Sequence, residues 1–66
     1  MILSNEMLEN AGMLLHYVSN SYANTISDVS VLLGISERDV AVIVRYLIEN
    51  KRIELVGDKL KVIRIK

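Results

Sequence analysis

Residues 27–39 read Ser-Asp-Val-Ser-Val-Leu-Leu-Gly-Ile-Ser-Glu-Arg-Asp, and this stretch decides the fold. Ser27 can cap a short helix, because its hydroxyl can accept an unpaired N–H of the first turn. Gly34 stands where such a helix would end in a left-handed residue. Ser36 follows with Asp39 three positions on, a carboxylate version of the capping box that starts another helix. Two capped helices joined by so tight a turn must cross, which predicts a helix-turn-helix.

Two longer helices are expected around this turn. The later one runs from Ser36 to about Asn50. The earlier one is capped by Ser4 or Asn5, and its apolar residues recur at helical spacing at Met7, Leu8, Ala11, Leu14, Leu15 and Val18. Residues 19–24 are rich in Ser and Asn and are predicted to form the loop that ends it.

The C-terminal part changes from helical to strand periodicity. Residues 53–56 and 59–66 alternate, and Gly57-Asp58 between them is typical of a two-residue hairpin loop. The register set by this loop pairs apolar with apolar residues on one face and Glu54 with Lys61 on the other. A slip of one residue would destroy both matches. The predicted pairs are Val56–Lys59, Leu55–Leu60, Glu54–Lys61 and Ile53–Val62.

The alternation shifts past Val62, since Ile63 and Ile65 point opposite to it. Either a bulge intervenes or both faces of this end of the strand are covered. A short third strand at residues 24–26 would pair there.

Length and composition indicate one α+β domain spanning residues 1–66. A chain this short buries only about 60% of its unfolded surface, and Leu, Ile and Val supply 25 of its 66 residues. Either the core is unusually complete or a second chain covers part of this surface. We favour the second alternative and expect a homodimer through the first helix and residues 1–3. Gly12, which costs a helix about 1 kcal/mol relative to Ala, would let a partner backbone approach.

The sequence contains no recognisable motif for catalysis or metal binding. There is no Cys, which excludes disulfides and thiolate metal sites. The single histidine, His16, cannot build a zinc site alone and is expected to have a structural or surface role. We find no phosphate loop, no paired catalytic carboxylates and no dinucleotide fingerprint. We therefore expect no enzyme, no cofactor, no metal and no small-molecule ligand.

Composition also bears on location and source. No apolar run approaches the roughly 20 residues that span a bilayer. Residues 1–3 are too short and uncharged for a signal peptide. These features predict a cytoplasmic protein with no membrane span. The absence of Cys, Gln and Pro, with abundant Ile, Val, Lys and Arg, is typical of a thermophilic source.

A formal net charge of zero hides a division along the chain. Residues 1–37 carry four acids and no base, whereas residues 38–66 carry eight bases against four acids. Such a difference between halves indicates contact with nucleic acid or with an acidic partner. The basic half also contains the last helix and the hairpin, the two elements that a small DNA-binding domain would present.

The order helix, helix, turn, helix, hairpin resembles the winged-helix family. The resemblance is carried by the run Ile-Ser-Asp-Val-Ser-Val-Leu-Leu-Gly-Ile-Ser at residues 26–36, and then by Val40, Val44, Leu47 and Ile53. The turn Leu33-Gly34-Ile35-Ser36 matches the family pattern, and the match covers roughly residues 11–66.

The chain departs from the family pattern at two places. Val29-Ser30 occupies the positions of the Leu-Ala pair that opens the family's second helix. Lys51 replaces the usual Gly between the third helix and the wing, so we expect Asn50 to take the left-handed conformation there.

The resemblance implies binding of double-stranded DNA, with the third helix in the major groove and the wing on the backbone or minor groove. The groove-facing positions it implies are Glu37, Arg38, Ala41, Val42 and Arg45. The wing positions are Asp58, Lys59 and Lys61. Arg38 and Arg45 lie seven residues apart on one helix face, and arginine is the commonest reader of guanine. The lysines are expected on phosphates.

Two classes of function remain open. The first is a small sequence-specific or semi-specific DNA-binding protein, a dimeric transcription regulator. The second is a winged-helix module for protein–protein contacts in a replication, transcription or membrane-remodelling assembly. Residues 40–48 include eight apolar residues of nine, which favours the second class. The arginines can also be solvated surface residues, and the hairpin lysines can serve to discourage strand pairing.

Overall fold

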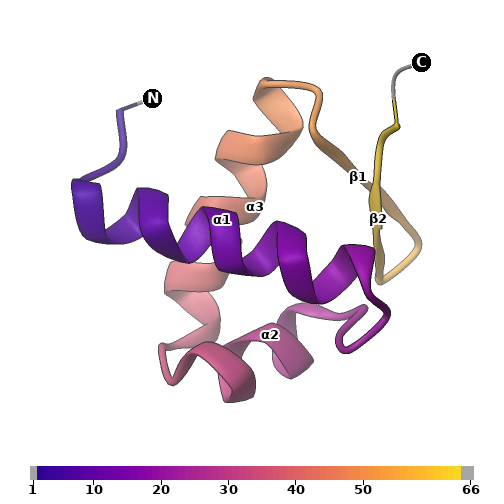
Figure 1. Ribbon diagram of the computed structural model, residues 1–66, viewed down its shortest axis with the longest axis horizontal. Coiled ribbons are helices and arrows are strands. Elements are labelled where there is room, and N and C mark those ends of the chain that lie inside the picture. Colours follow the sequence, from indigo (N-terminus) through magenta and orange to yellow (C-terminus); the bar gives the residue numbers. More distant parts are fainter. Residues whose placement is uncertain (1, 65–66) are drawn as a thin grey trace.

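The computed structural model describes residues 2–64 (Figure 1). Within this range, three helices, α1 (Asn5–Ser19), α2 (Ile26–Leu33) and α3 (Glu37–Glu49), precede two strands, β1 (Ile53–Val56) and β2 (Lys59–Val62). The strands form an antiparallel hairpin. In Figure 1, α1 crosses in front of α3, α2 lies below them, and the hairpin stands at the right. The predicted α+β architecture is confirmed, and its layout is consistent with a winged helix.

The two longer helices begin at serine caps, as predicted. The Ser4 hydroxyl accepts the backbone N–H of Met7 at 3.2 Å, and the Ser36 hydroxyl accepts that of Asp39 at 3.1 Å. Each bond satisfies a donor that has no partner inside its helix. These contacts span three residues, so they could be predicted from local sequence.

The cap of α2 is Thr25, and the prediction of Ser27 was wrong. Thr25 has extended backbone (φ −128°, ψ 161°), and its hydroxyl accepts the Asp28 N–H at 3.1 Å. The Asp28 carboxylate in turn accepts the N–H of Asn24, the residue before the cap, at 3.3 Å. Ser27 lies inside the first turn of the helix. Thr25 and Ser27 both carry a hydroxyl and both stand just before apolar residues of the helix, so the sequence alone did not distinguish which of the two caps α2.

The turn between α2 and α3 has the predicted left-handed glycine. Gly34 has φ 68°, and its N–H donates to the Ser30 carbonyl at 2.9 Å. The Ser30 hydroxyl donates to the Ile35 carbonyl at 2.6 Å. This additional bond holds the turn in place, and it makes Ser30 a structural residue of the helix-turn-helix.

The end of α3 differs from the prediction. Lys51, at φ 59°, is the left-handed residue, whereas Asn50 has φ −93°. Asn50 instead caps the helix, because its side-chain amide donates to the Tyr46 carbonyl at 2.8 Å. A lysine in this conformation is held by backbone bonds on either side, from Lys51 N–H to the Ile48 carbonyl at 3.0 Å and from Arg52 N–H to the Leu47 carbonyl at 2.8 Å.

The hairpin has the predicted register in all four pairs, Ile53–Val62, Glu54–Lys61, Leu55–Leu60 and Val56–Lys59. The Ile63 N–H donates to the Arg52 carbonyl at 2.9 Å, which continues this register without a bulge between Val62 and Ile63. Ile65 lies outside the described residues.

The predicted third strand is not formed in the described chain. Ile26 already belongs to α2, so too few extended residues remain for a strand. One bond, from the Leu60 N–H to the Asn24 carbonyl at 2.7 Å, joins this segment to β2.

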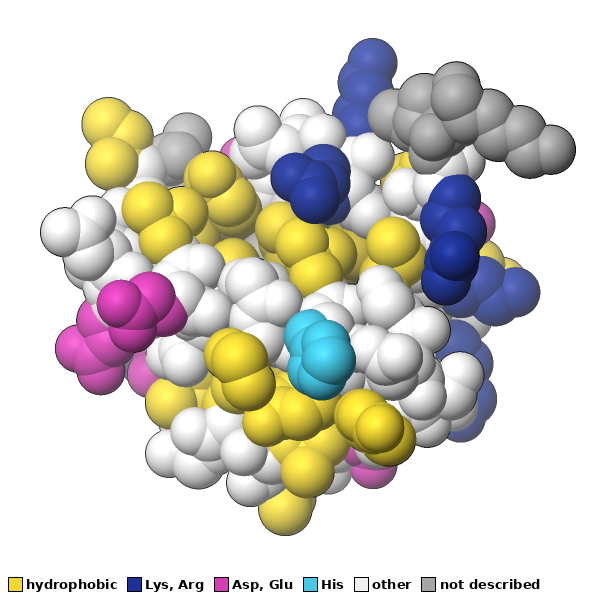
Figure 2. Space-filling view, viewed as in Figure 1, with side chains coloured by type: hydrophobic (Ala, Val, Ile, Leu, Met, Phe, Trp, Pro, Cys, Tyr) yellow, Lys and Arg dark blue, Asp and Glu magenta, His cyan; other side chains and the backbone are white. Residues whose placement is uncertain are grey.

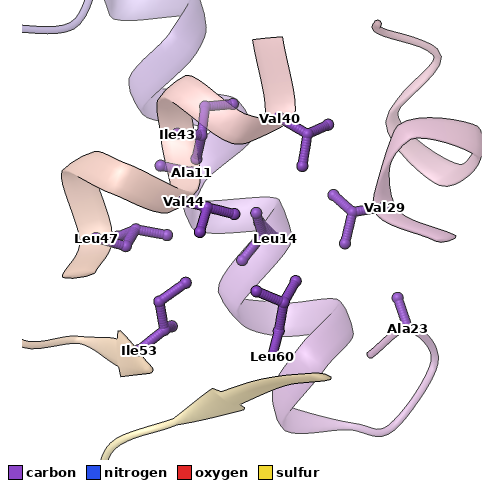
Figure 3. Close-up of a cluster of buried hydrophobic side chains, with 10 residues drawn as sticks. All are labelled: Ala11, Leu14, Ala23, Val29, Val40, Ile43, Val44, Leu47, Ile53 and Leu60. Carbon is purple, nitrogen blue, oxygen red and sulfur yellow. The ribbon is translucent and has the colours of Figure 1, made fainter. Parts of the chain in front are cut away.

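One core joins the helices, the α1–α2 loop and the hairpin (Figure 3). Its buried members are Ala11, Leu14, Ala23, Val29, Val40, Ile43, Val44, Leu47, Ile53 and Leu60. Four of these belong to α3, which therefore packs along one face. The other face of α3 stays exposed and includes Ala41, Val42 and Ile48. The apolar sequence of α3 thus does not reflect burial on all sides.

Candidate nucleic-acid interface

The exposed face of α3 contains the groove positions that the sequence predicted. Glu37, Arg38, Ala41, Val42 and Arg45 are all exposed. The last four line a single shallow hollow with a volume of about 200 Å³. Because residues three or four apart are neighbours on a helix surface, their spacing brings them together. The structure therefore assembles four predicted site residues on one rigid element.

This hollow combines two kinds of chemistry. Arg38 and Arg45 supply guanidinium groups, which can form two parallel hydrogen bonds to a guanine edge or to a phosphate. Ala41 and Val42 lie between them in sequence and supply methyl groups, which can contact a thymine methyl. A helix surface of this composition is suited to a major groove.

The hairpin lysines lie elsewhere. Lys59 and Lys61 are exposed, as is Asp58. The register places both lysines on the hairpin face opposite Leu55, since side chains alternate along a strand. Leu55 lines a second hollow together with Arg45, whereas Lys61 lines a third hollow beside the end of α1. The structure therefore brings Arg38 and Arg45 together but does not bring the lysines into the same hollow.

The second hollow was not predicted from the sequence. It has a volume of about 370 Å³ and is lined by Ile26, Ala41, Val44, Arg45, Ile48 and Leu55. Leu55 was assigned to the apolar face of the hairpin, but it is 43% exposed. The sequence did contain a signal for this hollow: α3 has more apolar residues than its one buried face can use.

The division of charge along the chain is also visible on the surface. Figure 2 shows acidic side chains near the start of α1 at the left and basic side chains gathered on the hairpin side at the right. Since α1 lies in front of α3 in this orientation, the outer face of α3 is not part of this view. The left part of the visible face is thus acidic and its right part is mostly basic, with an acidic side chain among the basic ones and further basic side chains at the upper centre.

His16 lies in a small aromatic cluster at the end of α1. Its ring centroid is 5.8 Å from that of Tyr17 and 6.2 Å from that of Tyr22. The Asn20 amide donates to the His16 carbonyl at 2.8 Å and caps the helix. These contacts fit the structural or surface role expected for this histidine.

Residues 2–64 contain neither a membrane-spanning helix nor a metal-binding cluster of side chains. No helix in this range is long and apolar enough to cross a membrane. The same range contains no group of three or more His, Cys, Asp or Glu side chains that could hold a metal ion.

Comparison with known proteins yields no relative: no family model matches the chain, and neither a curated protein nor a solved structure matches it.

Proposed function

We propose that this chain is a small winged-helix protein that binds double-stranded DNA, with α3 in the major groove and the hairpin on the backbone. The observation that carries the proposal is the surface of Arg38, Ala41, Val42 and Arg45, exposed on a helix whose opposite face is buried. A recognition helix needs this combination, because side chains read bases only when the helix beneath them is held in place.

Each site residue has a distinct role in this proposal. Arg45 lies in the middle of α3 and reaches base edges, while Arg38 lies in the first turn and contacts a base or a phosphate. Val42 contacts thymine methyl groups. Lys59 and Lys61 contact phosphates, which a flexible ammonium group does well. The four acids of the C-terminal half reduce the net attraction, so we expect weak binding by one copy and a steep dependence on salt.

A homodimer through α1 would double these contacts. Ile2 is 98% exposed, Leu8 is 41% exposed and Met13 is 42% exposed. Apart from its chain neighbours and the surrounding backbone of α1 itself, no described atom lies within 4 Å of the Cβ position at Gly12, so a partner helix can approach there. Leu3, by contrast, is 8% exposed and packs within its own chain. A partner on the outer side of α1 leaves the outer face of α3 open (Figure 1).

Fluorescence anisotropy with a random duplex at low and high salt tests the DNA proposal. We expect binding at low salt that collapses at high salt. The double variant Arg38→Ala/Arg45→Ala should lose more affinity than the matched double variant Arg52→Ala/Arg64→Ala, which removes the same charge outside α3. Absence of binding at low salt, or equal losses in both variants, would overturn the proposal.

Sedimentation at micromolar concentration tests the dimer, and a clean 7.5 kDa species would exclude it.

The apolar hollow favours a second candidate, a module that binds another protein. The side chains of Ile26, Ile48 and Leu55 offer a surface for an apolar group of a partner. This hollow shares Ala41 and Arg45 with the hollow that Arg38 and Val42 also line. DNA binding and protein binding would therefore compete for one face of α3. A folded chain that fails to bind duplex DNA at low salt would favour this candidate.

A further inference from the structure

β2 has one edge that β1 does not use. The Leu60 N–H donates to the Asn24 carbonyl, which lies outside the hairpin, whereas the Ile63 N–H donates to the Arg52 carbonyl on the β1 side. Backbone groups of successive strand residues alternate between the two edges of a strand. Leu60 and Val62 therefore direct their backbone groups away from β1. The contact with Asn24 uses the Leu60 N–H, but no described residue accepts the outward N–H of Val62.

A polar hollow lies along this unused edge. It has a volume of about 320 Å³ and is lined by Val18, Ser19, Ser21, Ala23, Asn24, Leu60, Lys61, Val62 and Arg64. The bond between Leu60 and Asn24 lies at one part of it. The α1–α2 loop forms the opposite wall. This is the place that a third strand would occupy, and residues 2–64 contribute only one hydrogen bond there.

The lining specifies the chemistry of an occupant. Lys61 and Arg64 supply positive charge, and Val18 and Ala23 supply small apolar surfaces. An extended segment would bond to Val62 through its main chain. Side chains of β2 alternate in direction, as those of an added strand would, so Lys61 and Arg64, three positions apart, lie toward opposite faces of the sheet. Carboxylates on one side of the added segment could then face Lys61, while apolar groups on the other side contact Val18 and Ala23, with Arg64 at the end of the hollow. The hollow thus fits an acidic segment in which charged and apolar residues alternate.

The same charges disfavour a second copy of this chain. Pairing β2 with β2 of another copy would gather Lys59, Lys61 and Arg64 of both copies along one seam. Like charges on neighbouring strands are destabilising, and lysines on an edge strand discourage such pairing. The edge therefore rejects another basic strand and accepts an acidic one.

We propose that the outer edge of β2 is a docking site for an extended acidic segment of another protein, which adds to the hairpin as a third strand. The proposal goes beyond DNA binding, since neither arginine of α3 takes part. It shares only Lys61 with the proposed phosphate contacts.

The probe is a fluorescein-labelled hexapeptide in which Glu and Val alternate, with blocked ends. Anisotropy gives its affinity, and amide NMR locates it. We expect the largest shifts at Val62 and Arg64 and little change at Arg38. A Lys–Val peptide should bind weaker by about tenfold or more because its charge is reversed. The Glu–Val peptide N-methylated at its valines should lose about as much, because it cannot donate to the strand edge.

Two double variants complete the test. Lys61→Glu/Arg64→Glu should weaken the Glu–Val peptide by about tenfold or more. Arg38→Glu/Arg45→Glu carries the same change of charge on α3 and should change the affinity by less than about twofold. All four residues are exposed, so both variants should fold, and circular dichroism verifies this.

Four results would overturn the proposal. Equal affinity for the N-methylated peptide would exclude strand addition. If inorganic phosphate displaces both the Glu–Val peptide and its N-methylated form, the hollow binds anions rather than a strand. Equal effects of the two double variants would reduce the binding to general charge attraction. A dimer of the peptide-free chain that Lys61→Glu/Arg64→Glu alone abolishes would assign the edge to a second copy.

Discussion

α1 and α3 are built alike at their ends but differ in how deeply they are buried. Each begins at a serine cap, and each ends at an asparagine whose amide donates to the carbonyl four residues earlier at 2.8 Å. α1 buries two side chains over 15 residues, whereas α3 buries four over 13. Local capping therefore starts and stops both helices equally well, and packing alone makes α3 the central one.

The hollow on the exposed side of α3 differs in charge from the exposed surface of α1. α1 presents Glu6 and Glu9 together with apolar side chains, while α3 presents Arg38 and Arg45 around Ala41 and Val42. A deeply packed helix gives its exposed side chains fixed positions, as base reading requires. The less buried α1 suits a partner that needs apolar and acidic surface. Four substitutions test this difference between α1 and α3.

Ile43→Ala should have the largest effect. Ile43 is fully buried in α3, and removing a buried isoleucine side chain costs about 2–5 kcal/mol. The matched control is Ile48→Ala on the same helix, where the side chain is 40% exposed and the cost should stay below about 1 kcal/mol. Urea unfolding measures both free energies. Equal costs would show that the outer face of α3 is also packed, as an interaction module in a dimer would be.

Arg45→Ala should act on binding rather than on stability. Loss of a base-reading arginine costs about 1–3 kcal/mol on a preferred site and relaxes sequence choice. The free energy of unfolding should change by less than about 0.5 kcal/mol, since the side chain is exposed. Anisotropy on preferred and scrambled duplexes measures the first quantity, and Glu9→Ala on α1 is the control. If stability falls by several times this amount while DNA binding is unchanged, Arg45 is a structural residue.

Ser36→Ala tests the cap that the two helices share. Loss of a serine cap costs about 0.5–2 kcal/mol. The cost should be larger than for Ser4→Ala, because Ser36 caps the helix that buries four side chains, whereas Ser4 caps a helix that buries two. Thermal unfolding of both variants gives the comparison. A larger loss for Ser4→Ala would mean that the start of α1 is held more tightly than its exposure indicates.

Lys59→Ala should have the smallest effect. Loss of one phosphate contact weakens binding to all duplexes alike and lowers the slope of log affinity against log salt by roughly one. Affinities over a salt series measure this slope, and Arg52→Ala is the control of equal charge. A change in sequence preference would instead make Lys59 a base reader, in contact with the groove that α3 occupies.

Much of the fold was determined by signals that act over a few residues. The caps at Ser4 and Ser36 and the left-handed Gly34 each satisfy a neighbouring backbone group, so their residue types could be recognised directly. The hairpin register was predictable for the same reason, because a two-residue loop permits few pairings and only one matches apolar and charged partners. The surface of α3 followed from its helical period alone.

Tertiary structure decided what depends on contacts between distant segments. The start of α2 at Ile26 leaves too few extended residues for a third strand, and one bond between the Leu60 N–H and the Asn24 carbonyl joins that segment to β2. The position of the hairpin relative to α3 separates Lys59 and Lys61 from Arg38 and Arg45, and it leaves Leu55 beside Ile48 in an exposed hollow. The unused edge of β2 has the same origin. Local hydrogen bonds specify the elements, but only the packing of those elements specifies which surfaces remain open.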